Sequence, residues 1–230
     1  MKWGRVAISV LLVLGLLCGF AGAEGLTDLI IDSRTTQSFT DEAVSDEDLN
    51  LILEAGLAAT SAINQQPWYF VAVTDSEVMG EIKGSAGGFG GAPAGVAPDG
   101  DKPEGDFPAP PQGSGMPSGG AKAGLGDSPV AIIIYMNEGT ASPNASFDCG
   151  LACQNMFIAA KALGYGAKIV SSPTMQLNGD NHDALCEKLG VDKSYSAVAV
   201  LLIGHEDETV DSTSGASVRS GMEERVSFVK

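Results

Sequence analysis

The sequence predicts a single domain that combines helices and strands. Short apolar runs of strand length alternate with segments whose apolar residues recur at helical spacing. Of the 230 residues, 44% are hydrophobic, which is enough for one well-buried core. Two full domains would be cramped in this length, so we expect one mixed α and β domain.

The first part of the chain is expected to hold three helices and one strand. A short helix is predicted over 27–32 and a stronger one over 45–59, where Ser45 caps a first turn rich in acidic residues. A β-rich run over 68–74 predicts a strand, and 75–83 a short helix. The residues of the second helix expected to face the core are Leu49, Ile52, Leu53 and Leu57.

Residues 84–126 differ in composition from the rest of the chain. They hold 14 of the 30 glycines and 7 of the 11 prolines, with hardly a β-branched residue. Such a segment cannot build a packed core. Because long loops are uncommon in compact domains, it is either a disordered insertion, which the composition favours, or a cover over a site.

The second half of the chain is expected to supply the centre of the domain. The continuous apolar run 130–136 is typical of a strand covered on both faces. The segment 146–163 predicts a central helix, because it is apolar or small on nearly every side and ends at Gly164. Further core elements are a strand over 167–171, a helix over 181–189 before Gly190, and a strand over 197–204.

Charge excludes several classes of protein. The chain has 13 Lys and Arg against 29 Asp and Glu, a formal charge of -16, so it lacks the positive surface of a nucleic-acid binder. His182 and His205 are too few for a histidine-based metal site and are expected at the surface. The usual nucleotide-binding and zinc-protease motifs do not occur.

The first 23 residues are predicted to be a secretory signal peptide. Lys2 and Arg5 precede an apolar run over 6–20, and the small residues 21–23 form a cleavage site. A membrane anchor is the other reading, but the run is shorter than the roughly 20 residues that span a bilayer. Cleavage predicts a secreted or periplasmic domain over 24–230 without stable membrane insertion.

Removal of this segment leaves three cysteines, so at least one thiol is unpaired within a chain. Cys149 and Cys153 are four residues apart on the predicted helix, a spacing with poor geometry for a disulfide. Together with Cys186, they are expected to be buried and to behave as small hydrophobic residues.

Four segments, in order, resemble the FMN-dependent nitroreductases. Residues 34–39 (RTTQSF) look like the family's RSxRxF loop, and 61–68 (SAINQQPW) resemble its SxxNxQPW signature. Residues 148–166 are similar to its DxGxxxQN helix and LGxG exit, and Arg219, followed by residues 222–224 and Val226, looks like the basic C-terminal segment. Together these matches frame residues 26–229, with 84–126 the main unmatched part.

The resemblance implies an α+β fold, a three-layer sandwich in which a mixed sheet carries helices on both faces. It also implies a homodimer that shares two FMN sites between its subunits. Arg34, Thr35 and Arg219 would meet the FMN phosphate, which needs permanent positive charge. The implied cofactor-binding residues are Arg34, Thr35, Gln37, Ser61, Ala62, Asn64, Gln154 (or Asn155 beside it), Ser171, Ser172 and Arg219.

The implied activity is two-electron transfer through flavin N5 to a nitroaromatic, a quinone or a similar small acceptor, with NAD(P)H as one candidate donor. The flavin carries the chemistry, so no catalytic side chain and no metal ligand are predicted. Gln37 stands where the family has a second basic residue, which removes one charge from the phosphate loop. The alternatives are an exported flavin-binding or interaction protein without activity, and a flavin enzyme that dehalogenates or oxidises its substrate.

Overall fold

The computed structural model describes residues 25–85, 125–140, 142–210 and 219–229, with side chains of 83–85 excluded. The chain divides into two compact units, residues 1–34 and 35–230. In the first unit, residues 25–32 form a helix, which confirms the predicted helix over 27–32. The predicted signal peptide over 1–23 and all but the ends of the segment 84–126 lie outside the described residues. Within the described part, no helix is both long and apolar enough to cross a membrane.

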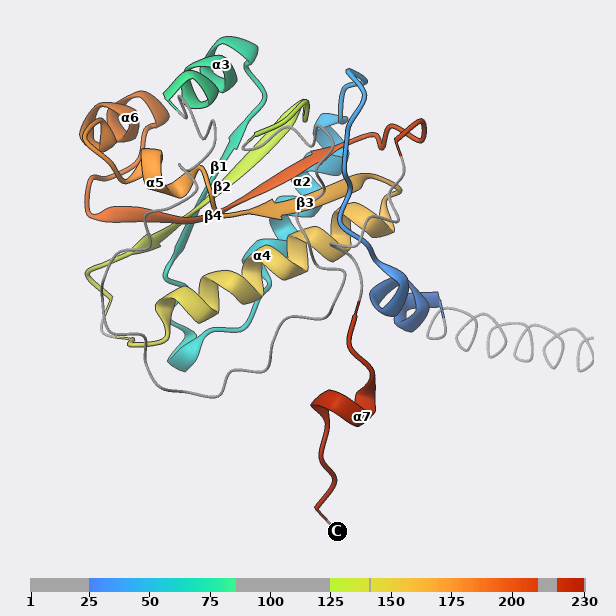
Figure 1. Ribbon diagram of the computed structural model, residues 1–230. Helices are drawn as coiled ribbons and strands as arrows, with labels where there is room; N and C mark the ends of the chain where they lie inside the picture. Colours follow the sequence, from blue (N-terminus) through green and yellow to red (C-terminus); the bar gives the residue numbers. More distant parts are fainter. Residues whose placement is uncertain (1–24, 86–124, 141, 211–218, 230) are drawn as a thin grey trace, which may run out of the picture. The chain divides into compact units, whose positions relative to one another are not determined.

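The second unit is built on a four-stranded sheet with the strand order β1-β2-β4-β3 (Figure 1). Its strands are β1 (Trp68–Val73), β2 (Val130–Asn137), β3 (Gly166–Val170) and β4 (Tyr195–Gly204). All four predicted strands are therefore confirmed to within about two residues, the usual uncertainty of strand ends.

The sheet is antiparallel among the described residues, whereas a mixed sheet was expected. All three strand pairs, β1 with β2, β2 with β4 and β3 with β4, are antiparallel. The reason is the position of β4. The helix α4 (Ala145–Ala162) connects β2 to β3 so that these two strands run in the same direction, but β4 lies between them and runs against both.

Helices cover both faces of the sheet, as expected for a three-layer α+β sandwich (Figure 1). One face carries α2 (Asp46–Leu57) and α4, which pack against each other. The other carries α3 (Ser76–Ser85), α5 (Thr174–Leu177) and α6 (His182–Leu189). Two shorter elements are the 3-10 helix η1 (Ala62–Asn64) and α7 (Met222–Arg225). Neither α5 nor α7 was predicted, because four residues are too few for a periodic pattern.

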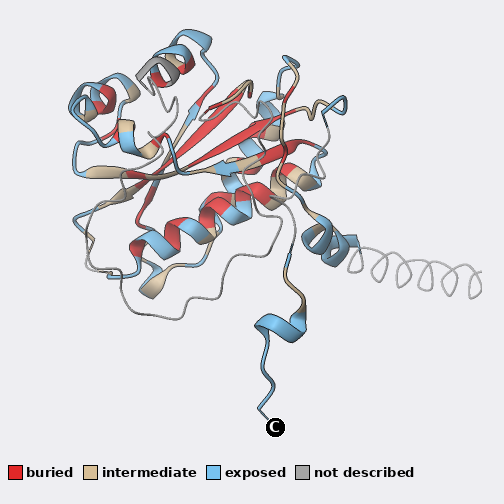
Figure 2. Ribbon diagram, viewed as in Figure 1, coloured by how far each residue is buried: buried red, intermediate tan, exposed pale blue. Residues whose placement is uncertain are grey.

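The strand β2 is the centre of the core, as its continuous apolar sequence predicts. Residues 130–135 are all buried, and Figure 2 shows the sheet as the most buried layer. Because successive side chains of a strand point to opposite faces, Ile132 and Ile134 pack with α2 and α4 while Ile133 and Tyr135 pack with the other layer.

The helix α4 confirms the predicted central helix. Gly164 adopts a φ of +88° just after it, a conformation that glycine enters without steric cost. Cys149 and Cys153 are buried on its core side and Cys186 on α6, all as free thiols, which confirms that they pack as small hydrophobic residues.

The core face of α2 differs from the prediction at its last turn. Ser45 caps the helix by accepting a hydrogen bond from the Asp48 amide, and Leu49 and Ile52 are buried as expected. Leu57, however, is 57% exposed. The buried stripe runs through Leu49, Ile52 and Gly56, and Leu57 lies about 100° further round the helix. Gly56, and not Leu57, therefore packs against α4.

We expect Gly56→Ala to destabilise the protein. A Cβ atom at this position would lie 2.7 Å from Cγ and 2.8 Å from Sδ of Met156, and 3.0 Å from Cε2 of Phe70. The resulting strain costs about 1–3 kcal/mol, which exceeds the gain of up to about 1 kcal/mol in helix propensity. Urea unfolding measures the difference. Gly80→Ala in α3 is the matched control, because its Cβ would meet nothing within 4 Å. Equal stability of the two variants would contradict the prediction.

Burial raises the pKa of Cys149 and of Cys153 to about 12. Both thiols should therefore resist alkylation at pH 8 in the native protein and react once it is unfolded, as peptide mass mapping would detect. Since an unfolded cysteine has a pKa of about 8.5, the folded state holds more protons above that pH. The stability contributed by these thiols is complete below about pH 8.5 and is lost as the pH rises towards 12. Rapid alkylation of either thiol in the native protein would contradict the prediction that both are protected.

Candidate functional site

The loop that follows Arg34 is joined to the edge strand β3 and to the end of β4. The Thr36 amide donates to the Ala167 carbonyl (3.0 Å), and the Ala167 amide donates to Oγ1 of Thr36 (2.9 Å). Further along, Phe39 forms a bridge with Glu206, and the Thr40 amide donates to the His205 carbonyl (2.9 Å). The loop therefore extends the sheet.

Thr35 and Gln37 lie on either side of this anchor. Thr36 is completely buried, whereas its two neighbours are partly exposed, as expected for alternating side chains of an extended segment. Nε2 of Gln37 donates to the Thr35 carbonyl (3.2 Å), which ties the two positions together. Thr35, predicted to meet the phosphate, and Gln37, predicted to bind the cofactor, are thus held at the surface by a buried residue between them.

Lys161, in the last turn of α4, is the charged group closest to this anchor. Its side chain is only 13% exposed, and its Nζ donates to Oγ1 of Thr36 (3.0 Å) and lies 3.7 Å from Oε2 of Glu206. Burial lowers the pKa of Lys161, and the negative charge of Glu206 opposes this effect. The ammonium group therefore occupies a site where its charge costs free energy.

The loop 61–66 is the second candidate segment, and it has an unusual backbone. Ile63, Asn64 and Gln66 have positive φ values of 47°, 59° and 47°. Side chains rarely adopt this left-handed region, so three such residues in one short loop store conformational strain. The loop is fixed to α4, because the Ala62 amide donates to Oδ2 of Asp148 (3.1 Å), a buried residue in the first turn of that helix.

The same loop presents hydrogen-bond donors to solvent. Oγ of Ser61 accepts from the Gln66 amide (2.9 Å), and Oδ1 of Asn64 accepts from Nε2 of Gln66 (3.1 Å). The acceptor atoms of these side chains are thus used within the loop, while the side-chain nitrogen Nδ2 of the exposed Asn64 has no hydrogen-bond partner among the described residues. Ile63 lies beside it and is 89% exposed.

The two amides on α4 have different surroundings. Nδ2 of Asn155 donates to the Ala55 carbonyl of α2 (3.2 Å), so this side chain serves helix packing. Gln154 is exposed, and its side chain makes no hydrogen bond in the part of the chain that the structure describes. Of these two candidates, Gln154 is the one able to reach a ligand.

Ser171 and Ser172 follow the edge strand β3 and are both exposed. The Ser171 carbonyl accepts from the Thr174 amide (3.0 Å) and from Oγ1 of Thr174 (2.7 Å), which starts the turn into α5. The position of both serines at the end of a strand agrees with the prediction.

The predicted arginines lie in other parts of the chain. Arg34 ends the first unit, is exposed, and donates through one guanidinium nitrogen to the carbonyls of Ile31 (2.9 Å) and Ser33 (3.0 Å). Arg219 is exposed in the C-terminal segment. Within the second unit, no hydrogen bond among its described residues joins Arg219, or residues 61–64, to the segment 35–37. The predicted residues of the second unit thus form separate groups.

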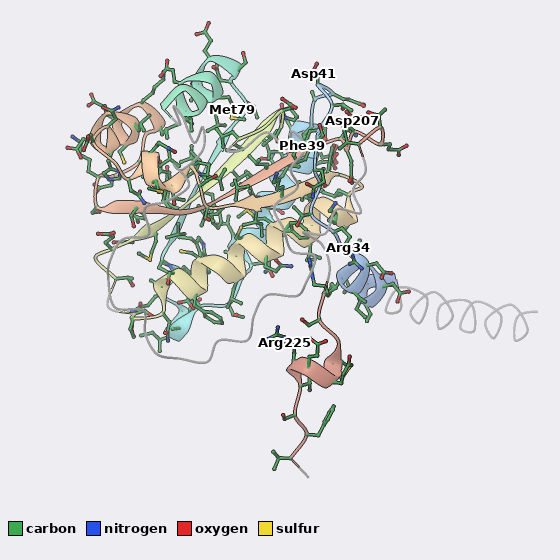
Figure 3. All side chains as sticks on the ribbon, viewed as in Figure 1. Arg34, Phe39, Asp41, Met79, Asp207 and Arg225 are labelled. Carbon is green, nitrogen blue, oxygen red and sulfur yellow. The ribbon has the colours of Figure 1, made fainter. Side chains whose placement is uncertain are left out.

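A cavity of about 580 Å³ lies beside the first loop, but its chemistry does not suit a phosphate. Glu42, Glu206, Glu208 and His205 contribute to its lining. Asp41 and Asp207 lie near Phe39 at this end of the unit (Figure 3), and the Asp207 amide donates to the Ser38 carbonyl (3.1 Å). This excess of carboxylates would repel an anion.

The two histidines are partly buried and bonded, whereas the sequence analysis placed them at the surface. The His182 ring lies 2.8 Å from the Leu177 carbonyl and 3.2 Å from that of Lys193, so it links the end of α5 to the loop before β4. His205 packs edge-on against Tyr165 and lies 3.7 Å from Glu42. Among the described residues, no group of side chains could hold a metal ion.

Residues 30–205 match the model of the nitroreductase family. The chain belongs to the nitroreductase family. A relative from Archaeoglobus fulgidus, provisionally named an NADH dehydrogenase/NAD(P)H nitroreductase, is 25% identical over 80% of this chain and 86% of its own length. The resemblance seen in the sequence motifs is therefore confirmed.

Solved nitroreductases share the fold. The FMN-bound nitroreductase of Bacteroides fragilis has a TM-score of 0.66 and 20% identity, over 89% of this chain and 98% of its own. That of Desulfitobacterium hafniense, also with bound FMN, has a TM-score of 0.65 and 20% identity over the same shares of the two chains. These structures support the α+β assignment, which the sheet and the two helical layers establish independently.

Three residues that the sequence motifs did not single out hold the candidate segments in place: Thr36 and Asp148, which are buried, and Lys161, which is partly buried. Thr36 and Lys161 support Thr35 and Gln37, and Asp148 supports residues 61–64. A signal was present for Lys161 and Asp148, because each is a charged residue in a helix that is otherwise apolar on most sides. Thr36 gave no signal, since a hydroxyl in a polar loop looks ordinary.

We expect Asp148→Ala to loosen the loop 61–64. The Ala62 amide would lose its acceptor, so its hydrogen exchange should accelerate, and the free energy of unfolding should fall by about 1–3 kcal/mol. NMR-detected amide exchange and urea unfolding measure these effects. Asp148→Asn keeps a carbonyl oxygen at the same position and should change the exchange rate much less. Unchanged exchange in Asp148→Ala would refute the supporting role.

Proposed function

We propose that this chain is an FMN-dependent oxidoreductase that transfers two electrons to a small acceptor such as a nitroaromatic or a quinone. The observation that carries the proposal is the loop 61–66. Three left-handed residues and the Asp148 carboxylate hold it in a strained form that leaves the Asn64 amide donors exposed. Strain of this kind persists at ligand sites, where the fold over-determines it.

The donor set fits a flavin mononucleotide. The guanidinium groups of Arg34 and Arg219 are suited to the phosphate, and both are exposed. Gln37, Asn64 and Gln154 offer amide donors for the polar atoms of the cofactor. Bound FMN supplies hydride acceptance at its N5 atom and electron transfer to the second substrate. The protein's part is to bind the cofactor, orient it and place donors near the ring.

The buried thiols favour a cofactor over covalent catalysis by cysteine. Cys149 and Cys153 are buried, and the pKa of each is raised to about 12. A thiol with such a pKa is almost entirely protonated at neutral pH, and the thiolate is the nucleophilic form.

The active form is proposed to be a homodimer. Within the second unit, no hydrogen bond among the described residues joins Asn64 or Arg219 to the segment 35–37, and a second copy would allow each FMN to be shared between subunits. Mass measurement in solution tests this. A strict monomer at micromolar concentration that still binds FMN tightly would contradict the shared site.

The protein is also proposed to act outside the cytoplasm, because residues 1–23 have the sequence of a signal peptide. NAD(P)H is scarce there, so the physiological reductant is proposed to be another carrier, although NADH and NADPH remain useful laboratory donors. N-terminal sequencing of the mature protein tests the cleavage after residue 23.

The deciding experiment is a visible absorption spectrum after FMN addition and desalting, followed by anaerobic titration with NADH, NADPH or dithionite and then with an acceptor. Flavin bands that are retained, bleach with a donor and return with a quinone or nitroaromatic support the enzyme. If the protein retains flavin but transfers no electrons between any of these donors and acceptors, the result would reject the oxidoreductase and favour a flavin-binding role. No retained flavin would reject both.

Arginine variants link that spectrum to the proposed phosphate site. Arg34→Ala and Arg219→Ala should each weaken FMN binding by about tenfold or more, since charge-assisted hydrogen bonds contribute about 1.5–3 kcal/mol. Arg225→Ala changes the net charge equally and is the control, because Arg225 falls outside the matched positions; it lies in α7 (Figure 3). Fluorescence titration of FMN gives the three dissociation constants, and equal values would contradict the assignment.

A further inference from the structure

Lys161 is a partly buried lysine whose position the packing of α4 does not explain. Its neighbours on the helix are apolar or small, and its own side chain is 13% exposed. Its ammonium group reaches out of the helix to the loop at Thr36 (3.0 Å) and to Glu206 (3.7 Å). An apolar side chain would fill the same space without the cost of burying a charge.

The contact with Thr36 determines the geometry of a second group. Oγ1 of Thr36 accepts from Nζ of Lys161 and from the Ala167 amide (2.9 Å), so both of its acceptor sites are occupied. Its own proton is then left to point towards Oε2 of Glu206 (3.5 Å). The hydroxyl cannot rotate without breaking one of these interactions.

There is also no room for the loop to shift towards the sheet. A Cβ atom on Gly166 would lie only 2.8 Å from both Oγ1 and Cγ2 of Thr36, so the threonine packs directly on the strand backbone. Thr35 and Gln37 project on the opposite side of the same extended segment. Their positions therefore depend on how firmly Thr36 is fixed.

We propose that Lys161 is a positioning residue for the cofactor: through Thr36 it fixes Thr35 and Gln37 in the arrangement that binds the flavin phosphate. This inference rests on the proposed function. It gives a reason for retaining a charged group that is unfavourable in a buried position. It also assigns a role at the site to a residue that touches neither the solvent-exposed donors nor the loop 61–66.

The test compares FMN with riboflavin, which has the same ring system but no phosphate. Lys161→Met should raise the dissociation constant of FMN by about tenfold to a hundredfold, the usual worth of a hydrogen bond to a charged group. The much weaker riboflavin binding should stay the same. Lys161→Arg keeps the charge and the donors and should restore most of the FMN affinity.

Lys168→Met is the matched control. Lys168 lies on β3 next to Ala167, but its side chain points to the other face of the sheet, and it forms no ion pair or hydrogen bond within the described residues. This variant removes the same charge from the same region and should bind FMN like the wild type. Thr36→Val, alone and combined with Lys161→Met, tests whether Lys161 acts through Thr36. If it does, the loss of FMN affinity in the double variant should be smaller than the sum of the two single losses.

Hydrogen exchange of the cofactor-free variants gives a readout that does not depend on FMN. Lys161→Met should accelerate exchange of the Thr36 and Ala167 amides and leave the melting temperature close to that of the wild type, Lys168→Met and Lys161→Arg. Wild-type affinity for FMN in Lys161→Met would overturn the positioning role. An equal loss for FMN and riboflavin, or a loss that follows melting temperature, would also overturn it. Failure of the wild type to bind FMN would instead reject the proposed function.

Discussion

The burial of β2 on both faces is the constraint on which the rest of the structure depends. A strand that is apolar on both sides needs two covering layers, and here α2 and α4 supply one while α3, α5 and α6 supply the other. Because α4 covers one face, its first turn contacts the loop 61–66 through Asp148, and its last turn contacts the loop 35–40 through Lys161. The two candidate segments thus share one support, a single helix of 18 residues.

Much of this arrangement could be predicted from sequence. Continuous apolar runs identify β2 and β4, and the helical spacing of small apolar residues identifies α4, because burial on all sides leaves a clear compositional pattern. The order of the strands could not be predicted in the same way. The residues of a strand do not determine which strand will be its neighbour. The position of β4 between β2 and β3 is therefore known only from the structure.

The sequence identified residues that are proposed to contact a ligand, but not the residues that support them. Arg34, Gln37, Asn64 and Gln154 stand out because polar residues recur at fixed positions in motifs. Thr36, Asp148 and Lys161 act through distant partners, and the hydrogen bonds that define them join residues 86 to 131 positions apart. Such pairings depend on tertiary structure. The same limitation explains Leu57, whose place against α4 is taken by Gly56.

The position of β4 has a consequence for the order in which this protein can fold during synthesis. It is the last strand in the chain, yet it lies between β2 and β3 and supplies the hydrogen-bonding edge for both. A nascent chain that ends before residue 195 can pair β1 with β2, but β3 has no strand to join. The sheet therefore closes only when nearly the whole domain has left the ribosome, and until then the apolar edges of β2 and β3 are open to other chains.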